Sequence, residues 1–190
     1  MKKIRNFVVL VVSLFLVVGC SMGVNNATDS VENYLNNYKS LNNDVVDQID
    51  EIVKEEDLTE EQQETYKKVL KRQYENMEYE ITDETYDGDI AKVTAKVTVY
   101  DYYKVQQEIA DYLKNNRDEF YKDGVYDENL YLDYKLEKMN KYDEKITHTI
   151  DFEVVKDNNT WVVSDLSRND LDKIHGIYDY SNDDTYNTEE

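Results

Sequence analysis

Apolar side chains recur at intervals of three and four residues between residues 29 and 77, a spacing that places them along one side of a helix. This pattern predicts helices over 29–41, 44–53 and 59–77, the first two either continuous or bent near Asn42-Asn43. Thr59 and Gln62 have the spacing of a capping box, which marks the start of the third segment. The first third of the folded region is therefore expected to be helical.

The period then changes to two, which is typical of strands with one buried face. One alternation covers 79–100 with a turn at Asp87-Gly88, and a second covers 146–163 with a turn at 157–159. Glycine, aspartate and asparagine at these turns are the residue types that tight hairpins use. Two β-hairpins are therefore predicted.

Helical spacing returns between the hairpins, over 104–121 and 127–140, and a short last helix is predicted from Ser167 to Gly176. Helices followed by two hairpins with helices inserted between them define an α+β fold. We expect the N-terminal helices to cover one face of an antiparallel sheet of about four strands. Residues 29–178 would form this single domain, and residues 179–190, which lack periodicity, are predicted to be a disordered acidic tail.

The N-terminus has the features of a secretory signal peptide. Three basic residues within the first five precede an apolar run over 7–18, which is too short to cross a bilayer as a helix. The following Val17-Val18-Gly19-Cys20 resembles a bacterial lipobox. The resemblance implies cleavage between Gly19 and Cys20 and attachment of a diacylglyceryl group to the Cys20 thiol. In the alternative, Cys20 is an unmodified thiol within an ordinary signal sequence.

Charge narrows the possible partners. The chain carries 42 acidic and 22 basic residues, a formal net charge of −20, and removal of residues 1–19 takes away three positive charges to leave −23. Nucleic acid is excluded as a partner, since nothing so acidic can neutralise phosphates. The expected location is the extracytoplasmic face of the cell membrane, with residues 20–28 as a flexible tether and Cys20 as the lipid anchor. The composition favours a low-GC Gram-positive source.

The pattern of the domain resembles that of a known superfamily. Residues 30–38, the hairpin that begins at 87–93 and the closing turn at 157–163 with its Trp161 are similar to extracellular lipoproteins of the cystatin-like, nuclear-transport-factor-two-like superfamily. The resemblance implies a sheet curved around helices into a cone. That fold hosts enzymes, such as ketosteroid isomerases, as well as binding and assembly domains, so it does not assign a function.

Catalytic motifs are few. The chain contains no GxSxG, HExxH or CxxC sequence, and neither Gly88 nor Gly124 stands in an EF-hand pattern, so no metal site or cofactor is predicted. One candidate pocket consists of His148 and Asp101, with Tyr100 and Tyr103 nearby. In the alternating pattern of their strands, His148 and Asp101 each fall on the same side as the apolar residues. An imidazole and a carboxylate in a pocket can act as general acid and base. In the alternative, His148 is a satisfied core histidine and Asp101 caps the next helix.

These observations favour a noncatalytic binding or assembly module held at the membrane surface by Cys20, with an extracytoplasmic protein as a candidate partner. The alternative function is a small-ligand carrier or an enzyme that uses the interior of the cone. The binding or assembly module and the carrier or enzyme require different interiors of the domain. A carrier or enzyme needs an apolar cavity in which His148 and Asp101 converge, whereas an assembly module needs a filled cone and an exposed aromatic patch.

Overall fold

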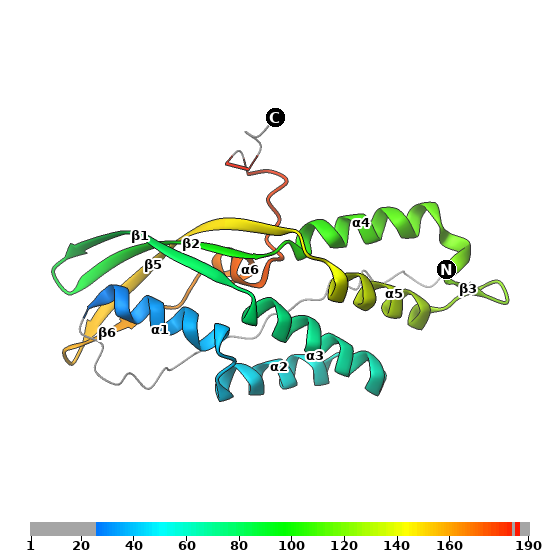
Figure 1. Cartoon of the computed structure of the whole chain (residues 1–190), viewed down its shortest axis with the longest axis horizontal. Helices are drawn as coiled ribbons and strands as arrows, with labels where there is room; N and C mark the ends of the chain where they lie inside the picture. Colours follow the sequence, from blue (N-terminus) through cyan, green and yellow to red (C-terminus); the bar gives the residue numbers. More distant parts are fainter. Residues whose placement is uncertain (1–25, 184, 187–190) are drawn as a thin grey trace.

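The computed structural model describes residues 26–183, 185 and 186, and this part of the chain is an α+β protein with a four-stranded antiparallel sheet (Figure 1). The helices are α1 (Ala27–Lys39), α2 (Asn43–Glu55), α3 (Glu60–Glu75), α4 (Tyr102–Asn115), α5 (Glu128–Lys141), α6 (Arg168–His175) and the 3-10 helix η1 (Arg117–Phe120). The strands are β1 (Glu78–Asp87), β2 (Ile90–Tyr100), β3 (Tyr121–Lys122), β4 (Val125–Tyr126), β5 (Lys145–Asp157) and β6 (Thr160–Val163). The predicted fold class is confirmed, with helices first and further helices inserted between two hairpins.

Side-chain caps set the helix starts. The Asn26 side chain accepts a hydrogen bond from the backbone N–H of Asp29 at 2.7 Å, so α1 starts at Ala27, within the segment expected to be a tether. Leu41 adopts a φ of 49°, which separates α1 from α2. Of the two alternatives, the bent one is therefore found. The predicted capping box at the start of α3 is present, with Gln62 as its second member.

The sheet has the strand order β1-β2-β5-β6, and every neighbouring pair is antiparallel. Both predicted turns connect hairpins, because Asp87 pairs with Ile90 and Asp157 pairs with Thr160. β5 is the longest strand, and the much shorter β6 pairs only with its last four residues. The remaining length of β5 therefore presents an edge that other segments must cover.

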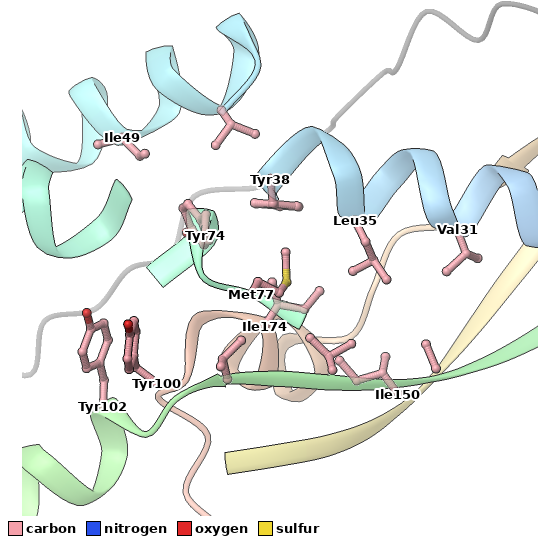
Figure 2. Close-up of a cluster of buried hydrophobic side chains, with 14 of the residues drawn as sticks. Val31, Leu35, Tyr38, Ile49, Tyr74, Met77, Tyr100, Tyr102, Ile150 and Ile174 are labelled. Carbon is pink, nitrogen blue, oxygen red and sulfur yellow. The ribbon is translucent and has the colours of Figure 1, made fainter. Parts of the chain in front are cut away.

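One face of the sheet is buried by helices. α1 and α6 contact both central strands, β2 and β5 (Figure 1). Figure 2 shows Val31 and Leu35 of α1 pointing toward the sheet, with Met77 and Ile174 between α1 and Ile150. Alternate side chains of β2 are buried as the alternation predicted, while the opposite face carries polar pairs such as Thr98 with Thr147. The concave side is thus filled by packed side chains.

The remaining helices form a bundle that extends past one end of the sheet (Figure 1). α3 packs against α2 and α5, and α5 also packs against α4. The helix predicted over 104–121 ends earlier, at Asn115, and the chain continues as η1 and the small β3–β4 hairpin. The hairpin forms because Asp123 and Gly124 adopt positive φ angles of 53° and 78°, which reverse the chain.

Candidate functional site

Asp101, the predicted carboxylate of the site, lies between β2 and α4 and caps the helix. Its Oδ1 accepts a hydrogen bond from the backbone N–H of Lys104 at 2.9 Å, and its Oδ2 accepts one from the hydroxyl of Tyr180 at 2.7 Å. The residue is only 5% exposed. Both carboxylate oxygens are therefore engaged, as the helix-capping alternative expected.

His148, the predicted imidazole of the site, is 1% exposed on the buried face of β5. Its Nδ1 lies 2.5 Å from the hydroxyl oxygen of Tyr186, and the rings of Tyr178 and Tyr186 pack against it. Burial, with a contribution from the Lys173 ammonium, lowers the pKa of His148 to about 4. The ring is therefore neutral near pH 7 and has the properties of a satisfied core histidine.

The structure does not bring the four predicted pocket residues together around one cavity. Tyr180 and Tyr186 lie between Asp101 and His148, with their ring centroids 5.3 Å apart. Tyr100 instead lies under the Arg72 guanidinium, whose Cζ is 3.8 Å from the ring centroid. Only the fourth residue, Tyr103, lines the cavity described below.

These contacts involve the segment after residue 178, for which disorder is predicted over residues 179–190. In its described part, Tyr180 contacts Asp101 and Tyr186 contacts His148 of β5. The apolar residues of this segment do not recur at helical or strand spacing. The described part packs through separate tyrosine side chains and forms no helix or strand. Hydrophobic spacing therefore gave no signal for this contact.

A cavity of about 250 Å³ lies within the helical bundle, among α2, α3, α4, α5 and α6. Its volume is just below the roughly 300 Å³ at which small-ligand sites begin. Its wall is mostly apolar, as in sites that bind small organic molecules. The aliphatic side chains of the wall are Ile52, Leu58, Leu70, Leu132, Leu136, Met139 and Ile177, and its tyrosines are Tyr66, Tyr74, Tyr102 and Tyr103.

Helical spacing explains how α3 and α5 present these side chains. Tyr66, Leu70 and Tyr74 follow one another at intervals of four along α3. On α5, Leu132, Leu136 and Met139 lie at intervals of four and three. Residues at these intervals share one face of a helix, so each helix contributes a continuous apolar strip to the cavity.

A lysine interrupts the strip on α5. Lys135 lies between Leu132 and Leu136, lines the cavity and is 8% exposed. Burial lowers the pKa of its ammonium group, and the nearby Glu56 carboxylate partly opposes this effect. Burial also raises the pKa of Glu56, which is half-buried at the cavity wall. The cavity thus combines an apolar wall with one lysine side chain that is almost entirely buried.

The cavity wall also contains a neutral pair of aromatic side chains, Tyr74 and His175. The hydroxyl oxygen of Tyr74 lies 2.8 Å from Nδ1 of His175, and both residues line the cavity. Burial lowers the pKa of His175 to about 4, so this ring is also uncharged near pH 7. Beyond it, Arg168 and Asp172 form an ion pair across one turn of α6, at 3.7 Å.

Sequence reasoning missed the cavity, although one signal was available. Helical spacing over residues 127–140 predicts a helix with Leu130, Tyr134, Leu136 and Met139 on one side. Leu136 and Met139 are buried and line the cavity, but Leu130 is 41% exposed, whereas Leu132, which this spacing omits, is 7% exposed. The helix is apolar on several sides, because Tyr131 and Tyr134 pack against Phe120 of η1. The available signal was Lys135, a charged residue between Leu132 and Leu136 on the apolar strip of α5.

Among residues 26–183, 185 and 186, no cluster of His, Cys, Asp and Glu side chains has the makeup of a metal site. Within the same ranges, no helix combines the length and apolar character required to span a bilayer. The predicted cleavage site at Gly19 and the predicted lipid attachment at Cys20 lie outside the described residues. The candidate site is accordingly the bundle cavity, and its most unusual group is the amine of Lys135.

No protein-family model, no curated protein and no solved structure matches this chain. A function for it must therefore be argued from its own residues.

Proposed function

We propose that this chain is a noncatalytic binding protein, anchored by a lipid on Cys20 to the extracytoplasmic face of the membrane, and that the bundle cavity is its ligand-binding site. The lipobox-like Val17-Val18-Gly19-Cys20 supports the anchor. The cavity supports the binding role, since it offers apolar surface inside a folded domain.

The observation that carries the proposal is the combination of an apolar wall with few polar groups. An apolar ligand gains free energy when its surface leaves water, and the few polar groups orient it. In the main alternative, Asp101 and His148 act as a catalytic pair. Both side chains are engaged with backbone or tyrosine partners, which favours the binding function over catalysis.

The test is photo-crosslinking of the full chain, reconstituted in lipid nanodiscs, with a diazirine derivative of 1-octanol. We expect saturable labelling of peptides that line the cavity. Leu132→Trp adds volume within the cavity and should lower this labelling about tenfold or more, because an overfilled site excludes the probe. The matched control is Leu130→Trp, the same change two residues away at an exposed position, which should leave labelling unchanged.

Circular dichroism and thermal unfolding establish that both tryptophan variants fold. If Leu132→Trp does not fold, Leu132→Phe replaces it as a smaller change. Labelling that spreads evenly over the surface, or that is equal in the two folded variants, would rule out the cavity as the binding site.

A second candidate function, assembly with an extracytoplasmic protein, is favoured by a different observation. Exposed apolar side chains gather at the end of the bundle formed by β3, β4 and the start of α5, namely Tyr121, Val125, Tyr126 and Leu130. Aromatic side chains of this kind are common in protein interfaces. Since this tip and the cavity use different side chains, the two functions are compatible.

A further inference from the structure

Lys135 is the least exposed of the charged residues that line the cavity. Lysine is almost never fully buried without one, because moving an ammonium group out of water is unfavourable. Within the described part of the chain, no hydrogen bond and no carboxylate oxygen within 4.0 Å satisfies its Nζ. The half-exposed Lys67, by contrast, has Asp50 at 3.0 Å. The buried lysine is therefore the one with the incomplete environment.

The charges that surround the cavity do not complete this environment. Glu56 acts on Lys135 only through its electrostatic field, and it is itself partly open to solvent. Asp172 is committed to Arg168 on α6. Gln106 donates its side-chain amide N–H to the backbone oxygen of Tyr102, at 3.0 Å. A negative group supplied from outside would provide the missing counter-charge.

The side chains around Lys135 also indicate that the uncharged part of the ligand is apolar. Leu132, Leu136 and Met139 lie on the same strip of α5 as the amine. A molecule whose charged head contacts Nζ would therefore place its body against aliphatic side chains. A cavity of about 250 Å³ accommodates a single short chain and not a diacyl lipid.

We infer that the cavity binds a small single-chain amphiphile with an anionic head, which pairs with the Lys135 ammonium while the chain lies against Leu132, Leu136 and Met139. This inference rests on the proposed function and specifies its ligand class. A carboxylate head and a phosphate monoester head share the required chemistry. An anion against Nζ favours the charged amine and so reverses the effect of burial on its pKa.

The experiment measures competition against the octanol-derived photoprobe, with full chain in nanodiscs. Octanoate, octyl phosphate, 1-octanol and octylamine compete in separate series. For each protein we measure the concentrations of 1-octanol and of octanoate that halve the labelling, and we take the ratio of the first to the second. This ratio is then compared between the wild type and each variant. Both compounds partition into the same lipid in every sample, so partitioning does not change the comparison. The octyl phosphate series distinguishes a phosphate head from a carboxylate head.

We expect Lys135→Met to lower this ratio about tenfold or more, because a charge-assisted hydrogen bond is lost while the length of the side chain is kept. Lys135→Arg should retain most of the preference for the anion. Lys138→Met is the matched control: it lies on the same helix, is exposed and does not line the cavity, so its ratio should equal that of the wild type.

The outcomes separate the two proposals. If every octyl compound competes but Lys135→Met leaves the ratio unchanged, or if octylamine competes best, the anion inference is wrong and the binding function stands. If no octyl compound competes and the probe does not label the cavity, both proposals are wrong. A Lys135-dependent preference for either anion supports the inference.

Discussion

Gln73 connects the end of α3 to the end of β2 through its side-chain amide. It is 1% exposed, and its Nε2 donates to the backbone oxygen of Tyr100 at 3.2 Å while its Oε1 accepts from the backbone N–H of Tyr100 at 3.0 Å. Gly176 completes the junction, since its backbone oxygen accepts a hydrogen bond from the N–H of Tyr103 at 2.8 Å. The ends of α3, β2 and α6 are thereby fixed beside the cavity.

Gly176→Ala should be strongly destabilising. The residue has a φ of 71°, and an added Cβ would lie 2.1 Å from the oxygen of Tyr100 and 2.3 Å from Nε2 of Gln73. We expect the free energy of unfolding, measured in urea, to fall by about 3 kcal/mol or more, from strain and overpacking together. Gly124→Ala is the control, since it has a similar φ of 78° but no atom within 4 Å, and it should lose only about 1 kcal/mol. Equal losses in the two variants would show that the close contacts of Gly176 are unimportant.

Residues 178–183, 185 and 186 belong to no helix or strand, but they cover the buried imidazole of His148. This segment closes over His148, which faces Tyr178, Tyr186, Lys173 of α6 and Asp183. When this segment opens, His148 regains contact with water. Its pKa then returns toward the ordinary value of 6.5, whereas in the closed state it is about 4.

Opening of this segment should therefore depend on pH. Above about pH 6.5 His148 is neutral in both states, and between 6.5 and 4 only the open state binds the proton. We expect the opening equilibrium constant of residues 178–186 to rise about a hundredfold or more as the pH falls from 7 to 4, measured by amide hydrogen exchange corrected for intrinsic rates. His148→Gln removes the titrating group and should abolish most of this rise. An identical pH dependence in that variant would instead assign the effect to Asp183 or other carboxylates.

The whole molecule is elongated, and its ends differ (Figure 1). α1 starts beside the turn of the β1–β2 hairpin, where the N–H of Thr28 donates to Glu84 Oε1 at 3.0 Å. The β3–β4 hairpin lies at the other end, past the bundle (Figure 1). Cys20 and Asn26 are six positions apart in the sequence, a stretch that spans at most about 22 Å. A lipid on Cys20 would therefore hold the β1–β2 turn near the membrane and direct the bundle away from it.

Cys20→Ala should abolish attachment to the membrane. Stable anchoring requires two acyl chains, and the acidic domain is repelled by anionic headgroups, so nothing else would retain the protein. We expect incorporation of an alkyne-tagged fatty acid to fall to background and the membrane-bound fraction to fall sharply. Ser21→Ala, the neighbouring control, should retain both. A labelled or fully membrane-bound Cys20→Ala protein would contradict the lipoprotein proposal.

Much of the fold could be predicted from local patterns. The capping box of Thr59 and Gln62, the turn at 87–88 and the alternation of β2 each depend on residues close in sequence. Such signals act before any long-range contact forms, so a single sequence displays them. The start of α1 was predicted two residues late, because Asn26 supplies the cap through its own side chain.

The candidate site could not be predicted in the same way. The alternation along β5 correctly placed His148 on the buried face. It does not reveal that His148 is covered by Tyr186, which lies 38 residues later in the sequence. On α5, spacing identified Leu136 and Met139 of the buried strip but included the exposed Leu130 in place of Leu132. Several faces of that helix are apolar, and only its packing against α3 and α4 selects one.

The sequence by itself therefore determined the order of helices and hairpins, the pairing of the strands at their turns and the acidic character of the chain, since these follow from local spacing and composition. Only the tertiary structure decided that Asp101 and His148 bind tyrosines of the C-terminal segment and that Lys135 lies at an apolar cavity. The physical reason is that a cavity forms where helices distant in sequence fail to fill the space between them. That space depends on how five helices pack together, which no local pattern records.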